Sequence, residues 1–112
     1  MYKINRNTII FTPKEKLYEW LKENDPEISF TFDQLKPQKV IFLVKELNDA
    51  NKAEKYMRDN SASLGLLILS SLNIEIPIPP NKRGWETLRE WFSIEWHKNV
   101  WDIEDEKIIK EI

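Results

Sequence analysis

The sequence predicts a single α+β domain: a small mixed β-sheet of about three to four strands packed with helices, in the order β-α-β-α-α-α-β. The chain has 112 residues, so residues 1–112 fit one domain. Hydrophobic residues make up 41% and charged residues 32%, which is enough apolar material for a core and argues against disorder. Short β-rich runs alternate with segments of helical periodicity, which favours helices packed on a sheet.

The first strand and the first helix are expected near the N-terminus. Thr8 to Thr12 is a β-rich run. The stretch "TPKE" (Thr12–Glu15) has the spacing of a capping box, with Pro13 at the first helical position, so it predicts the start of a helix. The dipeptide Asp25-Pro26 is expected to end that helix, because a residue before proline is pushed out of the α region.

The middle of the chain is expected to hold a turn and the central strand. Thr31 and Gln34 have capping-box spacing and favour a short helical turn over Phe32–Lys36, although the apolar alternation just before it would also suit a strand. "KVIFLVKE" (Lys39–Glu46) is the clearest strand. Its five consecutive apolar residues, Val40–Val44, predict burial on both faces and hence a central position.

Two helices and an extended segment should follow. A polar surface helix is expected from Ala50, capped by Asp49 or Asn48. A more buried helix, capped by a serine of "DNSAS", should run through Leu69. The three prolines in "NIEIPIPP" then predict an extended edge segment or a loop.

The segment "RGWETLREWFSIEWHKNVWD" holds four of the five tryptophans and the only histidine. Its first half has the apolar spacing of a helix and its second half alternates like a strand. We expect the tryptophans to lie mainly in the core, since their positions also carry the apolar stripe. The alternative is a stacking surface for bases, sugars or a partner's side chains. The candidate binding residues of this segment are Arg83, Arg89, Glu90 and Trp91.

The strand of this segment carries the candidate catalytic residues Glu95, His97 and Asp102. Glu95 and His97 should project from one face of the strand, whereas strict alternation places Asp102 on the other. A β-bulge or an equivalent kink near Lys98–Asn99 would bring the three together. It would also align an apolar face made of Ile94, Trp96, Trp101 and Ile103. Such a group suits weak metal binding or acid–base chemistry, and its structural alternative is a partly exposed histidine bonded to a carboxylate.

Composition excludes several classes of function. The absence of cysteine removes disulfides, zinc–thiolate sites and thiol nucleophiles. Two glycines cannot build a phosphate-binding loop, and one histidine cannot supply a two-imidazole zinc site, so we expect no cofactor and no bound metal. A net charge of −2 makes nucleic acid an unlikely partner. The longest apolar stretch, Leu64–Leu69, is too short for a membrane span, and no signal-peptide pattern opens the sequence, so a cytoplasmic protein is expected.

The C-terminal segment resembles that of a family of small uncharacterised bacterial proteins. In this family a helix ends in Arg-Glu-Trp-Phe, and the strand after it carries an acidic residue, an aromatic residue, a histidine and then an aromatic–Asp pair. The matching positions are Arg83, Arg89, Glu90, Trp91, Phe92, Glu95, Trp96, His97, Trp101 and Asp102. "IIFTPKEKLYEWL" and "KVIFLVKELND" are similar to the family's opening and central strand, whereas Gly84 and the weakly acidic middle helix depart from it. The resemblance implies a similar fold, these candidate residues and a bacterial setting, and it implies no reaction.

The leading functional hypothesis is a non-enzymatic protein-interaction or self-associating domain, with an unknown protein partner or a homodimer. One alternative is a weak metal-binding or acid–base enzyme centred on Glu95, His97 and Asp102. The other is nucleotide or single-stranded nucleic-acid binding through exposed tryptophans.

Overall fold

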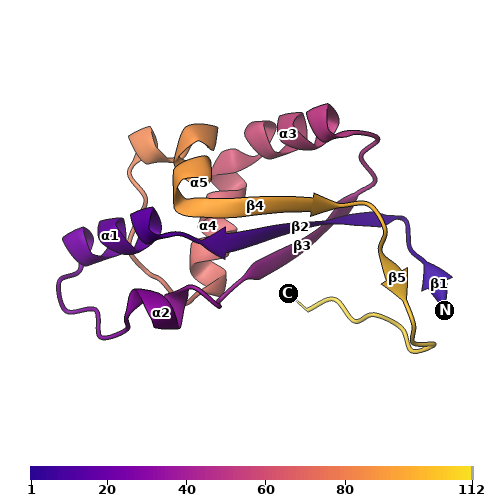
Figure 1. Cartoon of the computed structure of the whole chain (residues 1–112), viewed down its shortest axis with the longest axis horizontal. Coiled ribbons are helices and arrows are strands. Elements are labelled where there is room, and N and C mark those ends of the chain that lie inside the picture. The colour runs from indigo at the N-terminus through magenta and orange to yellow at the C-terminus, as the bar shows by residue number, and fades with distance from the viewer. Residues whose placement is uncertain (112) are drawn as a thin grey trace.

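A computed structural model describes residues 1–111 and confirms the α+β class (Figure 1). Its sheet elements are β1 (Tyr2–Lys3), β2 (Arg6–Pro13), β3 (Val40–Lys45), β4 (Phe92–His97) and β5 (Trp101–Asp102). Its helices are α1 (Glu15–Asn24), α2 (Phe32–Leu35), α3 (Ala50–Asp59), α4 (Ser61–Ser71), the 3-10 turn η1 (Pro80–Lys82) and α5 (Trp85–Trp91). Over the described residues, no helix combines the length and the apolar character needed to cross a membrane.

The main sheet has three strands in the order β3-β2-β4, and both of its ladders are antiparallel rather than mixed. β2 is therefore the central strand, and the prediction that Lys39–Glu46 forms the central strand was wrong. The apolar run in β3 is not buried on both faces, because Ile41 and Leu43 are exposed while Val44 is buried. The β1–β5 ribbon forms a separate two-stranded sheet at one end of the molecule, away from α1 and α2 (Figure 1).

The main sheet has one buried face and one face open to solvent. Along β2, Asn7, Ile9, Phe11 and Pro13 are buried, and the residues between them are only half-buried. The Phe11 ring meets the Phe42 and Phe92 rings edge-on at 5.8 Å, which ties the three strands together on the buried side. Apolar side chains from α1, α3, α4 and α5 join this face in one core cluster, so the helices pack on a single side of the sheet.

Capping patterns in the sequence correctly predicted the starts of α2 and α3, but gave the wrong cap for α1 and α4. The Thr31–Gln34 capping box is confirmed in both directions, and Asp49 caps α3 by accepting from the Lys52 amide at 2.9 Å. The predicted capping box over Thr12–Glu15 is wrong: α1 begins at Glu15 after Lys14, with no side-chain cap. Pairing explains this, because β2 runs on through Pro13 opposite Phe92 and therefore holds Thr12 in extended conformation. The residue before α4 is Asn60 rather than a serine.

The end of α4 turns sharply into the proline-containing segment. Asn73 adopts a left-handed φ of 58°. The Ile74 and Asn73 amides donate back to the Leu69 and Ser70 carbonyls at 2.9 Å and 3.0 Å, which is the paired bonding of a Schellman motif. The chain then runs without regular structure to η1, as the prolines predicted.

The chain breaks its strand after His97. Residues 98–100 are not in a strand, and Trp101 and Asp102 pair with Lys3 and Tyr2 in the second ribbon. A straight ladder through Ile103 is therefore absent, but the expected β-bulge or kink within one strand is instead a break between two sheets. The predicted apolar face beyond it is wrong, because Trp101 and Ile103 are 55% and 70% exposed. The tail after β5 has no helix or strand up to residue 111.

Candidate functional site

Glu95 and His97 lie side by side on the open face of the sheet. They alternate on β4 with Phe92, Ile94 and Trp96, which turn toward the core, so the strand period places both polar side chains outward. His97 Nε2 is 3.2 Å from Glu95 Oε2, and the two side chains are 53% and 56% exposed. This is a solvated histidine–carboxylate contact, the structural alternative that the sequence left open.

Asp102 does not join the other two candidate catalytic residues. It belongs to β5, which pairs with β1, and its Oδ1 accepts from the Glu104 amide at 2.9 Å. No group of three or more His, Asp or Glu side chains in residues 1–111 is placed to hold a metal ion. Because the interruption moves the chain into a different ribbon, Glu95 and His97 are left as a pair.

The four candidate binding residues do not form one surface. Arg83 Nε donates to the Ile78 carbonyl at 2.7 Å and so fastens the loop before α5. Arg89 lies 3.4 Å from Glu86 and over the Trp85 ring at 5.9 Å. Trp91 is 4% exposed, whereas Glu90, next to it on α5, is exposed. The side chains of this set therefore point in different directions and bond mainly within the fold.

The indoles serve mostly as core, as the sequence predicted. Trp91 packs on Trp20 with ring centroids 4.6 Å apart, and both are buried. Trp85 and Trp96 are half-buried against the core. In the described chain Trp101 is the one tryptophan that is mainly exposed, so no cluster of free indoles offers a stacking surface.

A buried asparagine that sequence reasoning missed joins three distant segments. Asn7 is 3% exposed on the inner face of β2. Its Oδ1 accepts from the Leu47 amide at 2.9 Å and from Trp96 Nε1 at 3.0 Å. One side-chain oxygen therefore ties β2 to the segment after β3 and to β4. The sequence hints at this role in one way: Asn7 is a polar residue at an alternating position of β2 whose other members include the buried Ile9 and Phe11.

The open side of the sheet carries an apolar centre beside this polar pair. We define the open face as the outward residues of the three strands: Arg6, Thr8, Ile10, Thr12, Ile41, Leu43, Lys45, Ser93, Glu95 and His97. Ile41 and Leu43 on β3 are 61% and 50% exposed, and the half-buried Ile10 lies beside them on β2. The face is thus apolar along β3 and polar along β4.

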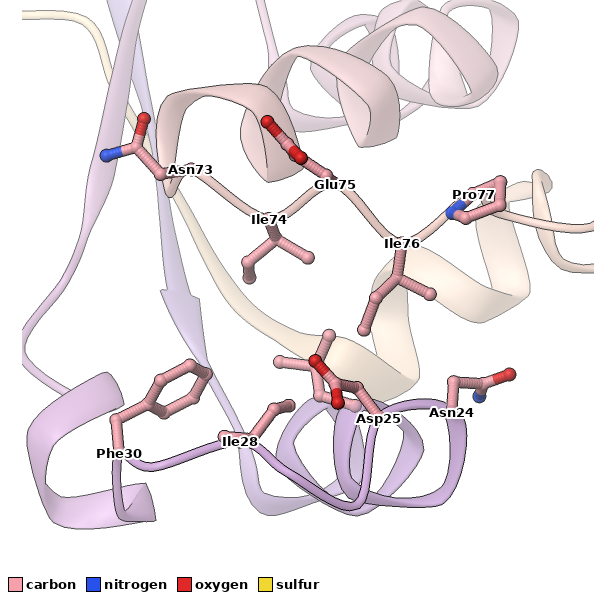
Figure 2. Close-up of a pocket in the computed structure, with 10 residues that line it drawn as sticks. Asn24, Asp25, Ile28, Phe30, Asn73, Ile74, Glu75, Ile76 and Pro77 are labelled. Atoms are coloured by element: carbon pink, nitrogen blue, oxygen red, sulfur yellow. The ribbon is translucent and has the colours of Figure 1, made fainter.

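A second feature is a hollow between the α1–α2 loop and the extended segment after α4. It has a volume of about 530 Å³, and its lining mixes apolar and polar side chains: Leu21, Asn24, Asp25, Ile28, Phe30, Asn73, Ile74, Glu75, Ile76 and Pro77. Figure 2 shows Ile74 and Ile76 pointing toward the loop that carries Ile28 and Phe30, with the Asp25 carboxylate among them. Asp25 Oδ1 also accepts from the Glu27 amide at 3.2 Å. Neither Glu95 nor His97 lines this hollow.

Comparisons of the chain with protein-family models, with curated proteins and with solved structures found no match. The resemblance to the small bacterial family therefore stays a prediction. Chemically, the Glu95–His97 pair can form polar contacts, and the open face can bury apolar surface against another molecule.

Proposed function

We propose that this protein is a non-enzymatic interaction domain that works by self-association through the open face. The observation that supports this most directly is the exposure of Ile41 and Leu43, at 61% and 50%, on a sheet face that the helices leave bare. Burial of such side chains contributes roughly 25 cal/mol per Å² of apolar surface removed from water. Contiguous exposed apolar surface rimmed by polar groups is typical of an interaction site.

The size of the open face sets the strength expected of the contact. It comprises ten residues, whereas a standard stable interface uses about 20–30 residues on each side. The association should therefore belong to the weak or transient class, with a dissociation constant on the order of micromolar or weaker.

Catalysis receives less support from the same residues. Glu95 and His97 are more than half exposed, and within residues 1–111 no third His, Asp or Glu side chain joins them in a group that could hold a metal ion. An acid–base site needs groups whose protonation is tuned by burial or by a partner charge, together with a place for substrate next to them. The pair does not line the hollow between the α1–α2 loop and the segment after α4, so a role as polar contacts in an interface suits it better.

Analytical ultracentrifugation over a wide protein concentration range tests the proposal. Ile41→Glu places a carboxylate in the apolar centre and should shift the dimerisation midpoint upward by at least about 10-fold, since each tenfold corresponds to about 1.4 kcal/mol. The matched control is Leu67→Glu, which changes an equally exposed leucine (56%) on α4, in the helical layer.

The wild-type protein and Leu67→Glu should form dimers at similar concentrations, while Ile41→Glu stays monomeric. A wild-type protein that is monomeric throughout would contradict the proposal. So would a loss of association caused by Leu67→Glu rather than by Ile41→Glu.

A further inference from the structure

We propose that the two copies pair their open faces about a twofold axis that runs across the strands, between the levels of Thr8 and Ile10 on β2. This inference rests on the proposed self-association and adds its geometry. It also gives Glu95 and His97 a role: the carboxylate of each copy meets the imidazole of the other. The second copy is the partner because the face is complementary to itself under this rotation.

The strand registers place the open face in rows. Thr8 is opposite Leu43 on one side and opposite His97 on the other, so these three residues form one row across the sheet. Ile10 is opposite Ile41 and Glu95, and these form the next row. Each row therefore starts with an exposed aliphatic side chain on β3 and ends with a titratable side chain on β4. The two rows end in opposite formal charge when His97 is protonated.

An axis that crosses the strands midway between these rows exchanges them. It carries β3 over β3 and β4 over β4 of the second copy, with the strands of the two sheets antiparallel. Leu43 then lies over Ile41 of the second copy, and His97 lies over Glu95. Packed sheets are about 10 Å apart with strands within about 30° of each other, a spacing that these side chains can bridge. An isologous contact makes each of these pairs twice.

The alternative axis, parallel to the strands, gives a poor match. It would carry β3 of one copy over β4 of the other. Ile41 and Leu43 would then cover Glu95 and His97, which would lose water without gaining a polar partner. Across the strands, in contrast, the Glu95–His97 contact of 3.2 Å within each chain becomes part of an alternating group of four. Complementary polar groups of this kind fix register and orientation more than affinity.

The remaining charges of the open face lie at its rim. Arg6 is at the end of β2, and the axis carries it over Thr12 of the second copy. Lys45 is at the end of β3, and its Nζ lies 5.7 Å from the Tyr56 ring centroid on α3, so the ammonium leans toward the helical layer. The axis carries the end of β3 toward Lys39 of the second copy, but these two ammonium groups belong to sheets about 10 Å apart, twice the spacing of about 4.8 Å between paired strands, and solvent screens them.

Pairing through a strand edge is the other way in which two sheets can join. Two copies of β3 paired about Phe42 would place Lys39 opposite Lys45 twice, and like charges opposite each other destabilise a ladder. Two copies of β4 paired about Trp96 would also bring Glu95 opposite His97. A test must therefore probe the central strand, β2, because both of its edges are already paired and its outward side chains can meet a second copy only face to face.

Cysteine crosslinking separates these arrangements, because the chain contains no cysteine of its own. Thr8→Cys and Ile10→Cys variants carrying different tags are mixed at a concentration where sedimentation shows dimers, and are treated with a short thiol-specific crosslinker. The control mixture combines Leu43→Cys with His97→Cys, two positions of one row that meet only if the axis runs along the strands. Circular dichroism melts of each variant establish that it is folded before it is mixed.

The inference predicts a crosslinked heterodimer from the Thr8/Ile10 mixture in several-fold excess over the Leu43/His97 mixture. A dimer that crosslinks through Leu43 and His97 instead, or that crosslinks in neither mixture, overturns the axis. If the wild-type protein stays monomeric in sedimentation, the proposed self-association itself is contradicted. This outcome is distinguishable from dimers that form but crosslink in a way that contradicts the axis.

Discussion

Removing the buried acceptor of Asn7 is expected to destabilise the fold far more than its small size suggests. In Asn7→Ala the Leu47 amide and the Trp96 indole lose the oxygen to which they donate at 2.9 Å and 3.0 Å. Leu47 is 8% exposed, so its amide has little access to water, whereas Trp96 is half-buried and its N–H can be partly rehydrated. The two losses are therefore unequal.

The expected magnitude follows from these environments. An orphaned buried donor costs about 1–3 kcal/mol, and a hydrogen bond whose donor can return to water costs about 0.5–1.5 kcal/mol. Together they predict a loss of about 1.5–4.5 kcal/mol in the free energy of unfolding. For a domain of this length that corresponds to a fall in Tm of about 6–18 °C.

Urea unfolding followed by tryptophan fluorescence measures this loss, at a protein concentration where the chain is monomeric. Thr12→Ala is the control, because it is a polar truncation on the opposite face of the same strand and should cost less than about 1 kcal/mol. In a double-mutant cycle, Asn7→Ala should cost about 0.5–1.5 kcal/mol less in a Trp96→Phe background, since one donor is already gone. A loss below about 1 kcal/mol for Asn7→Ala, or strict additivity in the cycle, would refute the reasoning.

Three smaller effects on the free energy of unfolding can be measured in the same assay. Asn73→Ala should cost about 1 kcal/mol, because alanine resists the left-handed φ of 58°, whereas Asn73→Gly should leave stability unchanged or raise it; equal losses in both would contradict this. Thr31→Ala removes the side-chain cap of α2 and should cost about 1 kcal/mol, and the absence of any loss would show that the box is not formed in solution. Trp85→Phe should cost about 1 kcal/mol less than Trp96→Phe, because the buried Trp85 N–H has no hydrogen-bond partner among residues 1–111 while the Trp96 N–H has one; the reverse order would show that the Trp85 N–H is bonded.

The type of each element could be read from local patterns, but the pairing of strands could not. The capping boxes and the apolar periodicity act within a few residues, so α2, α3, α5 and β4 were predicted from the sequence alone. The central position of β2 depends on β3 and β4, which are tens of residues away along the chain. The same distant pairing carries β2 through Pro13 and overrides the capping box that the sequence suggested at Thr12.

The candidate site could be predicted only in part, again because the pairing of distant strands leaves no local pattern in the sequence. The period of a strand placed Glu95 and His97 together, whereas the bulge expected near Lys98–Asn99 is a break between two sheets. Asp102 was wrongly grouped with Glu95 and His97, because β5 pairs with β1, and this two-residue strand is too short to show an alternating pattern in the sequence. Asn7 was missed because its donors lie 40 and 89 residues away, a separation that no local pattern reports.

The misjudged run in β3 is itself informative about function. Five consecutive apolar residues predict burial on both faces, and within the described fold only one face is covered. The edge of this strand carries lysine at both ends, which discourages strand addition, and Lys45 leans toward Tyr56 beside α3. The edge is thus protected while the aliphatic face stays bare. A surface that needed only solubility would place polar residues at positions 41 and 43, so this combination favours an association that covers the face and leaves the edge free.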